Sequence, residues 1–254
     1  MMEKSCPFLL WRVIGLVALL TQSAWGKYPV PPYYAITLSN EGVDRITERP
    51  NQPAEVKILQ KGAIIKPDDF VTTGPSSYTE YKAYGITLRQ GSDTISQWLG
   101  DHHWKIMDGS IMFCIEDKMT LTVSSLKGSA EVTGPCTFIA EATSNGGYKF
   151  ISLSGKPKLR TEKKTVTMPA GRLVLVLGEQ ESLGNAYDFD IMLLLQSSLL
   201  FNAFESPPPT MKKIGLAVFA QQKTLKGKYN ALIGDATSDK NLQMWVLGNQ
   251  AAAK

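Results

Sequence analysis

Short runs in which apolar and polar residues alternate follow one another from about residue 64 to residue 177. Met119–Val123 and Ala130–Val132 alternate strictly. A period of two places neighbouring side chains on opposite faces, which predicts strands that are half buried in a sheet. Residues that favour turns separate the runs, as at Gly134-Pro135 and Pro169-Ala170-Gly171. Asn145-Gly146 between two runs predicts a type I′ hairpin turn.

The spacing of these runs predicts an all-β fold. Strands that recur every 8–12 residues or so are typical of a β-solenoid-like domain or a sandwich. No helical segments alternate with the strands, which argues against a parallel α/β sheet. We place the β domain at residues 63–180.

One long helix is predicted near the C-terminus, over residues 188–204. Its residues are mostly apolar, and Asp188 and Asp190 at its start suit the exposed amides of a helix N-terminus. Gln196, Ser197 and Asn202 interrupt the apolar character and disfavour a membrane span. We therefore expect residues 186–206 to pack as a helix on the sheet. A Pro-rich linker and tail follow at 207–254, in which Ile214–Phe219 suits a strand or a short helix.

Residues 27–62 are rich in Pro and Tyr at their start. Pro29, Pro31 and Pro32 fix φ and lack a backbone donor, so this segment is a poor candidate for the core. Ala35–Leu38 is the one stretch in it that suits an added edge strand.

The first 26 residues have the three-part pattern of a secretory signal peptide. Lys4 and Arg12 flank the start of an apolar run, and Ala24-Trp25-Gly26 supplies small residues for cleavage. We expect the mature chain to begin at Lys27 and to be periplasmic or secreted. The alternative is an uncleaved anchor over residues 8–25, and the chain would contact a membrane only in that case.

Composition excludes some classes of protein. Hydrophobic residues make up 43% of the 254 residues, which favours a globular body over a disordered one. The net charge of +4 is small for this length, and a nucleic-acid binder would show a stronger basic patch.

Cys114 and Cys136 are the cysteines that remain after the predicted cleavage. An exported pair is free to form a disulfide, and both lie in expected strands of one domain. Two buried free thiols are the alternative, because sequence does not give their separation.

Residues with catalytic chemistry do not form a known constellation in this sequence. His102 and His103 are adjacent, so on a strand they would point to opposite faces, and we expect a polar loop there. Paired carboxylates at Asp68-Asp69, Glu116-Asp117 and Asp188/Asp190 are typical of turns and caps. We expect no enzyme activity, no catalytic or metal site and no cofactor.

A basic stretch contains Lys156, Lys158, Arg160, Lys163 and Lys164. Lysines of this kind often line a solvated strand edge, where they discourage aggregation. A patch that binds an anionic polymer is the alternative interpretation.

Residues 65–178 resemble a FecR domain. The resemblance rests on motifs that occur in the family's order: Val71-Thr72-Thr73-Gly74, Asp108-Gly109 before an apolar strand, Gly134-Pro135-Cys136-Thr137-Phe138, Leu153-Ser154-Gly155 and Pro169-Ala170-Gly171. The resemblance implies structural roles for the motif residues Gly74, Gly109, Gly134, Phe138, Gly155 and Gly171. Phe138 is expected to be an inward anchor of the core.

The resemblance implies an exported, β-solenoid-like module without catalytic residues. In signalling members such a domain transmits receptor occupancy to a cytoplasmic anti-sigma segment. Residues 1–12 are too short for that segment, so we expect a binding or structural module of the envelope. Its partner would be an envelope protein or polymer, bound at an exposed strand edge or at the Tyr/Pro-rich segment. A membrane-anchored signalling protein and a polysaccharide-acting enzyme are the alternatives.

Overall fold

The computed structural model describes residues 33–38, 42–48, 53–83, 85–177, 182–225, 229–232 and 244–247. Residues 32–254 form one compact unit. The predicted signal peptide lies outside the described residues, as do Lys27–Pro32.

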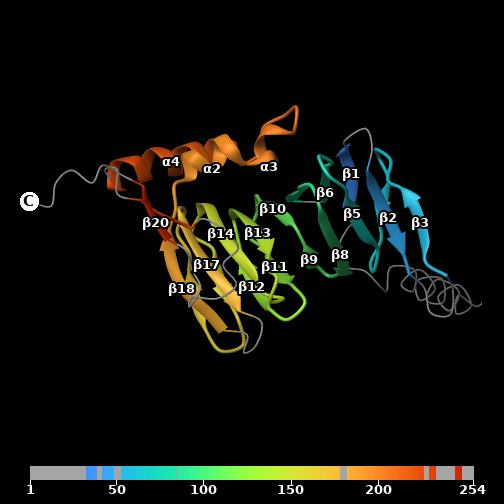
Figure 1. The fold of residues 1–254 in the computed structure, drawn as a ribbon, viewed down its shortest axis with the longest axis horizontal. Coiled ribbons are helices and arrows are strands. Elements are labelled where there is room, and N and C mark those ends of the chain that lie inside the picture. Colours follow the sequence, from blue (N-terminus) through green and yellow to red (C-terminus); the bar gives the residue numbers. More distant parts are fainter. Residues whose placement is uncertain are drawn as a thin grey trace, which may run out of the picture. The chain divides into compact units, whose positions relative to one another are not determined.

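Two nine-stranded sheets account for most of this unit (Figure 1). Sheet A consists, in spatial order, of β18 (Ser182–Asp188), β17 (Arg172–Leu177), β14 (Tyr148–Gly155), β13 (Cys136–Ala142), β10 (Ser110–Ile115), β7 (Ile86–Gln90), β6 (Thr79–Ala83), β1 (Tyr33–Leu38) and β4 (Ile64–Ile65). Sheet B consists of β16 (Thr165–Thr167), β15 (Lys158–Arg160), β12 (Ser129–Thr133), β11 (Thr120–Ser124), β9 (His103–Asp108), β8 (Thr94–Gly100), β5 (Phe70–Thr73), β2 (Val43–Thr47) and β3 (Glu55–Ile58).

From β5 onward the chain passes back and forth between the two sheets, one or two strands at a time. Strand order within each sheet largely follows chain order, as in a solenoid, while the two sheets face one another as in a sandwich. Neighbouring strands are antiparallel except β9 and β11, which are parallel, with His103 opposite Thr122. The predicted all-β fold is confirmed.

Aromatic side chains fill the space between the sheets at the β1 end. The Tyr33 ring of sheet A meets Trp98 and Trp104 of sheet B edge-on, with ring centroids 5.0 and 5.1 Å apart. Tyr33 is fully buried. The expectation that residues 27–62 contribute little to the core is therefore wrong at β1. Its prolines precede the strand, and Tyr33 and Ala35 point inward from it.

Phe138 occupies the inner face of sheet A farther along. Its ring stacks between Phe113 of β10, 4.9 Å away, and Phe150 of β14, 4.7 Å away. All three side chains are fully buried. Large aromatic surfaces of this kind supply much of the apolar area that a sandwich core buries.

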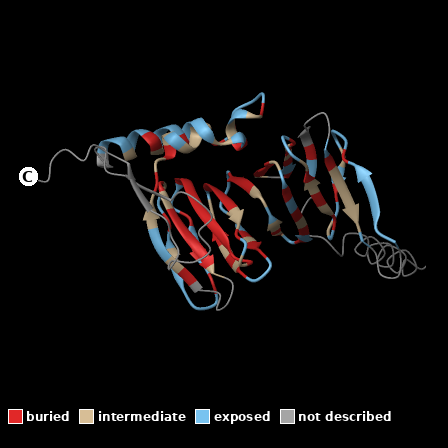
Figure 2. Ribbon diagram, in the orientation of Figure 1, coloured by how far each residue is buried: buried red, intermediate tan, exposed pale blue. Residues whose placement is uncertain are grey.

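Three helices cover part of the outer face of sheet A: α2 (Ile191–Ser197), α3 (Leu199–Asn202) and α4 (Met211–Leu225). Because the helices cover this face, both faces of β14 are buried along nearly its whole length. In β8 of sheet B, by contrast, buried residues alternate with more exposed ones (Figure 2). Met112, Ile139 and Leu153 pack on this outer face against Ile214 and Val218 of α4.

The helical segment differs in detail from the prediction. Residues 182–188 form strand β18, and the helix expected over 188–204 is two short helices that break at Ser198. The backbone of Ser198 is extended, and its side chain caps α3. The longest helix, α4, lies within the expected linker and tail. A hairpin of β19 (Tyr229–Leu232) and β20 (Met244–Leu247) follows it.

The Asn145-Gly146 turn links β13 and β14 as expected, but it is not type I′. Gly146 has a φ of +90°, whereas Asn145 is not in the left-handed region that a type I′ turn requires. The Asn145 side chain instead accepts hydrogen bonds from the Gly147 amide at 3.1 Å and the Thr143 hydroxyl at 2.7 Å. Among the described residues, no helix is both long and apolar enough to cross a membrane.

Candidate functional site

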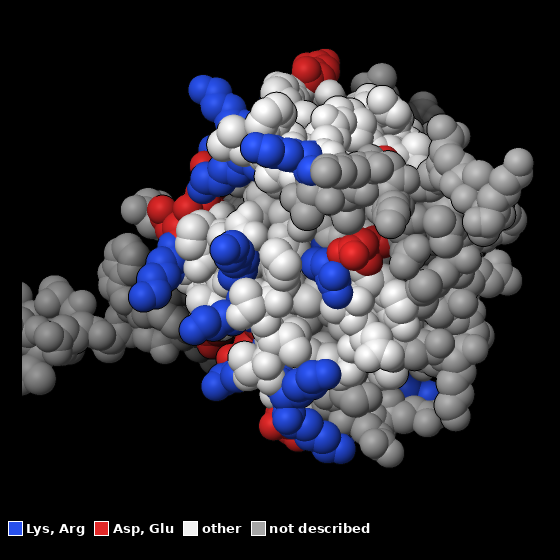
Figure 3. All heavy atoms as spheres, turned by 90° about the vertical axis from the view of Figure 1, so that its left-hand side faces the viewer, with Lys and Arg blue, Asp and Glu red and all other residues white. Residues whose placement is uncertain are grey.

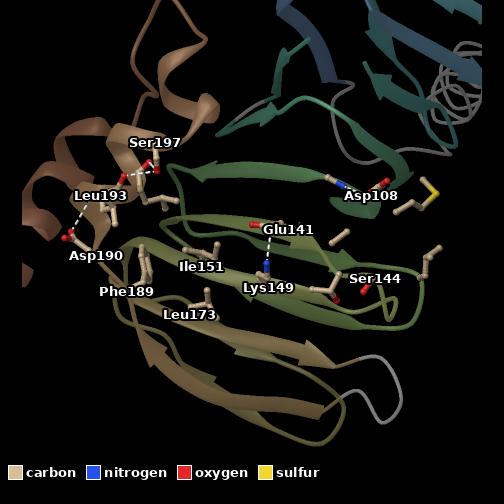
Figure 4. A pocket seen from close by; sticks show the side chains of 16 residues that line it. Asp108, Glu141, Ser144, Lys149, Ile151, Leu173, Phe189, Asp190, Leu193 and Ser197 are labelled. Carbon is tan, nitrogen blue, oxygen red and sulfur yellow. Dashed lines mark hydrogen bonds and ion pairs between the residues drawn. The ribbon is translucent and has the colours of Figure 1, made fainter. Parts of the chain in front are cut away.

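A groove of about 860 Å³ lies on the outer face of sheet A, beside α2 (Figure 4). Strands β13, β14 and β17 form its floor, and α2 forms a wall at one end. The turns that follow β9 and β13 close the other end. We call this cavity the α2 groove.

The end of the α2 groove next to the helix is mostly apolar. Ile151 and Leu173 lie opposite one another on β14 and β17 and form the floor there. Phe189, Leu193 and Leu194 add apolar surface from the start of α2 and the segment before it. The side chain of Leu193 is 45% exposed, so this end presents apolar surface to solvent.

Asp190 fixes where the helical wall begins. Its carboxylate accepts hydrogen bonds from the backbone amides of Met192 at 2.9 Å and Leu193 at 3.3 Å. An aspartate at this position satisfies amides that a helix leaves unpaired. Gln221 of α4 also binds the start of α2, because its side-chain oxygen accepts a hydrogen bond from the Ile191 backbone amide at 3.0 Å.

The middle of the α2 groove contains an ion pair between neighbouring strands. Lys149 of β14 and Glu141 of β13 are opposite in register, and Lys149 Nζ lies 2.9 Å from Glu141 Oε1. The Lys149 side chain is 8% exposed and the Glu141 side chain 40%. Burying an ammonium group is costly unless it is paired, so Glu141 allows Lys149 to occupy this position.

Carboxylates outnumber cations in the lining. Glu141, Asp108 and Asp190 are acidic, and Lys149 is basic. Asp108 and Ser144 lie at the end far from α2 (Figure 4). Both ends therefore mix polar and apolar side chains, since Asp190 lies beside Leu193 at the helix end and Met107 and Leu126 accompany Asp108 at the other. Sequence analysis missed the α2 groove, because only the β13–β14 register and the position of α2 bring these residues together.

A second exposed feature is strand β3, the outermost strand of sheet B. All four of its residues are exposed, and Val56 and Ile58 are 60% and 76% exposed. β3 pairs with β2 on one side. Strands β2 and β5 separate it from β8, the strand that carries Trp98, and it lies at the opposite end of sheet B from β16.

The two histidines do not share a site. His102 lies in the turn before β9, whereas His103 begins that strand and its Nε2 lies 2.7 Å from the Ser124 hydroxyl. Burial lowers the pKa of both imidazoles. Within the described ranges, no three His, Cys, Asp or Glu side chains are close enough to hold a metal ion.

The three carboxylate pairs hold turns and strand ends. Asp69 is buried and accepts from the Thr47 hydroxyl at 2.7 Å and the Lys66 amide at 2.8 Å. Glu116 and Asp117 are exposed in the turn after β10. Asp188 pairs with Arg172 at 2.8 Å.

Cys114 and Cys136 are both buried free thiols, so the structure lacks the disulfide that the sequence allowed. Cys114 of β10 lies opposite Thr137, the neighbour of Cys136. Burial raises the pKa of Cys114 to about 11 and that of Cys136 to about 12. Such thiols are protonated at neutral pH and unreactive, because the thiolate is the nucleophile.

The basic stretch lies on the β15–β16 hairpin, at the edge of sheet B. Lys158 and Arg160 project from β15 and are exposed, and Arg160 pairs with Glu131 of β12. Lys156, Lys163 and Lys164 are exposed in the flanking turns. The face shown in Figure 3 carries scattered basic side chains and fewer acidic ones. This arrangement matches a solvated edge.

The glycines of the FecR-like motifs lie at turns and strand ends. Gly109 links β9 to β10 with a φ of +71°, and a Cβ there would lie 2.6 Å from the Thr94 Cα, so only glycine fits. Gly155 and Gly171 also have positive φ, Gly74 precedes a turn, and Gly134 lies in the bend between β12 and β13.

Comparisons with known proteins give weak matches. No family model matches the chain, and no curated protein matches it. Two solved structures, each described as a candidate anti-sigma factor from Parabacteroides distasonis ATCC 8503, are similar to part of it. One has a TM-score of 0.40 and 9% identity, and the match covers 50% of this chain and 65% of that one. The other has a TM-score of 0.38 and 8% identity, with 70% and 99% covered. At these scores the likeness supports no argument about function.

Proposed function

We propose that the protein is an exported, non-catalytic binding module of the cell envelope, and that the α2 groove holds a segment of a partner protein. The observation that carries the proposal is the composition of the groove. Apolar side chains line much of the groove, and Asp108 and the Glu141–Lys149 ion pair supply charge toward the end far from α2. Clefts of this size with a few placed polar groups are the usual sites of ligand binding.

The lining favours a segment with apolar and cationic side chains. Apolar residues would cover Leu173 and Leu193, and Lys or Arg would approach Asp108 and Glu141. An anionic polymer would meet three carboxylates and one lysine. A neutral polysaccharide is usually held on exposed aromatic faces, and Phe189, the aromatic residue in the lining, is 8% exposed.

Two labelled peptides that share the same Leu and Phe positions test the proposal. One carries Lys at its polar positions and the other carries Glu. Fluorescence anisotropy should show tighter binding of the Lys peptide, with affinity that falls as salt is added. Leu193→Asn should weaken it about tenfold, because binding would bury only the exposed part of Leu193, and burying a whole leucine contributes roughly 1.5–3 kcal/mol.

Leu216→Asn is the matched control, because Leu216 is an exposed leucine of α4 outside the groove lining. Its affinity for the peptide should stay unchanged. Equal binding of the two peptides, or equal loss in the two variants, would contradict the proposal.

Export is supported by the signal-like pattern of residues 1–26. Amino-terminal sequencing of protein from fractionated cells should find a start near Lys27 in a soluble exported fraction. An intact Met1 in the membrane fraction would favour the membrane-anchored signalling alternative instead.

A further inference from the structure

Strand β3 leaves half of its backbone groups facing away from sheet B. Leu59, which directly follows β3, donates its amide to the Val43 carbonyl of β2 at 2.9 Å. The β2–β3 register continues from this pair, with Lys57 opposite Arg45 and Glu55 opposite Thr47. Hydrogen-bonded pairs alternate with non-bonded pairs along an antiparallel ladder. The N–H and C=O groups of Val56 and Ile58 therefore point to the outer edge.

Proteins usually protect exposed strand edges from pairing with other strands, and β3 carries two exposed apolar side chains instead. Basic side chains surround β16 at the opposite edge of sheet B, and such charges discourage edge pairing. On β3, Val56 and Ile58 share one face and are exposed, and Val56 lies opposite the half-buried Ile46 and Ile58 opposite Asp44. An exposed edge with apolar side chains is a template for another strand.

We propose that β3 pairs antiparallel with β3 of a second copy of this chain, on a twofold axis through Val56. In this register Val56 lies opposite the Val56 of the copy, and their outward N–H and C=O groups bond one another. Glu55 then lies opposite Lys57 of the copy on both sides of the axis. Opposite charges directly across an antiparallel pair are stabilising.

The charges select this register from its neighbours. Outward-facing backbone groups occur at every second residue, so allowed registers differ by two. A shift of the copy by two residues in one direction places Glu55 opposite Glu55 of the copy. The same shift in the other direction places Lys57 opposite Lys57 of the copy. Both neighbours bring like charges together, which is destabilising.

Glu55 and Lys57 already interact within one chain. Lys57 Nζ lies 2.6 Å from Glu55 Oε1, and both side chains are about half exposed. Pairing of two chains would turn two such ion pairs into a cluster of four alternating charges. Arg45, the strand neighbour of Lys57, is engaged elsewhere, since it donates to the Ile64 carbonyl at 3.1 Å and lies 3.9 Å from Asp69.

Sedimentation velocity of the full-length protein tests the pairing. Because the interface is one short strand, we expect a weak dimer that forms between roughly 1 µM and 1 mM. Glu55→Lys or Lys57→Glu alone should weaken dimerisation about tenfold or more, since two cross-strand pairs change from attractive to repulsive. The double variant Glu55→Lys/Lys57→Glu should restore the wild-type dissociation constant within about threefold.

Two further variants separate edge pairing from other effects. Val56→Pro removes an amide that faces the outer edge and not β2, so it should abolish the dimer while the thermal unfolding midpoint changes little. Lys164→Glu, the same charge change on the β15–β16 hairpin, should leave the dimer unchanged. A wild-type monomer throughout this concentration range, or single swaps that the double variant does not rescue, would overturn the proposal.

Discussion

Arg89 shows at the scale of one residue how the helical layer is attached to sheet A. Its side chain is 1% exposed, and its Nε lies 2.6 Å from a Glu80 carboxylate oxygen of β6. The guanidinium also donates to the carbonyls of Leu200 at 3.3 Å and Ser206 at 2.5 Å, and it lies 4.3 Å from the centre of the Phe204 ring. One cation thus joins β6 and β7 to α3 and to the segment that follows α3.

Arg89→Met should lower the free energy of unfolding by about 3–5 kcal/mol, because it leaves the largely buried Glu80 carboxylate without its partner. It should also loosen residues 200–206, which hydrogen exchange would detect as faster exchange there. Urea denaturation measures the free energy.

Arg160→Met is the control for this substitution. Arg160 also pairs with a glutamate, Glu131, but its side chain is 61% exposed. An exposed ion pair contributes about 1 kcal/mol or less, so this variant should unfold close to the wild type. Equal losses of stability in both variants would show that Arg89 is not a buried anchor.

At the scale of elements, most strands were predictable and the helices were less so. Alternation at 119–123 and 130–132 gave strands that the structure contains as β11 and β12. For α4 the sequence left a strand or a short helix open over Ile214–Phe219, although Met211, Ile214, Val218 and Gln221 follow a helical spacing. Its solvent side carries exposed Leu216 and Phe219, so the sequence lacks the clear apolar and polar faces that mark a surface helix.

The burial of β1 and the separation of the two thiols depend on tertiary contacts that the local sequence does not reveal. β1 follows three prolines, but Tyr33 inserts between Trp98 and Trp104, and this burial outweighs the local signal. Cys114 and Cys136 lie in strands of one domain, as expected, yet only the register shows that Cys114 lies opposite Thr137 and not Cys136.

At the scale of the whole molecule, the α2 groove depends on how distant segments are placed. Its lining runs from Met107 to Ser197 and comes from both strand turns and a helix. The sequence pattern predicted the strands that carry Glu141 and Lys149, but it did not predict that these two residues lie opposite one another. The pattern also predicted an apolar segment near residue 191, but it did not indicate on which face of the sheet that segment packs. The proposed site is therefore a product of tertiary structure.

The most direct test of the central claim is a methyl NMR titration of the protein with the Leu- and Lys-containing peptide. Binding in the α2 groove predicts chemical-shift changes that saturate at Ile151, Leu173 and Leu193, with little change at Ile58 or Leu216. Changes confined to Ile58, or no saturable change at the three groove residues, would contradict the assignment of this groove as the binding site.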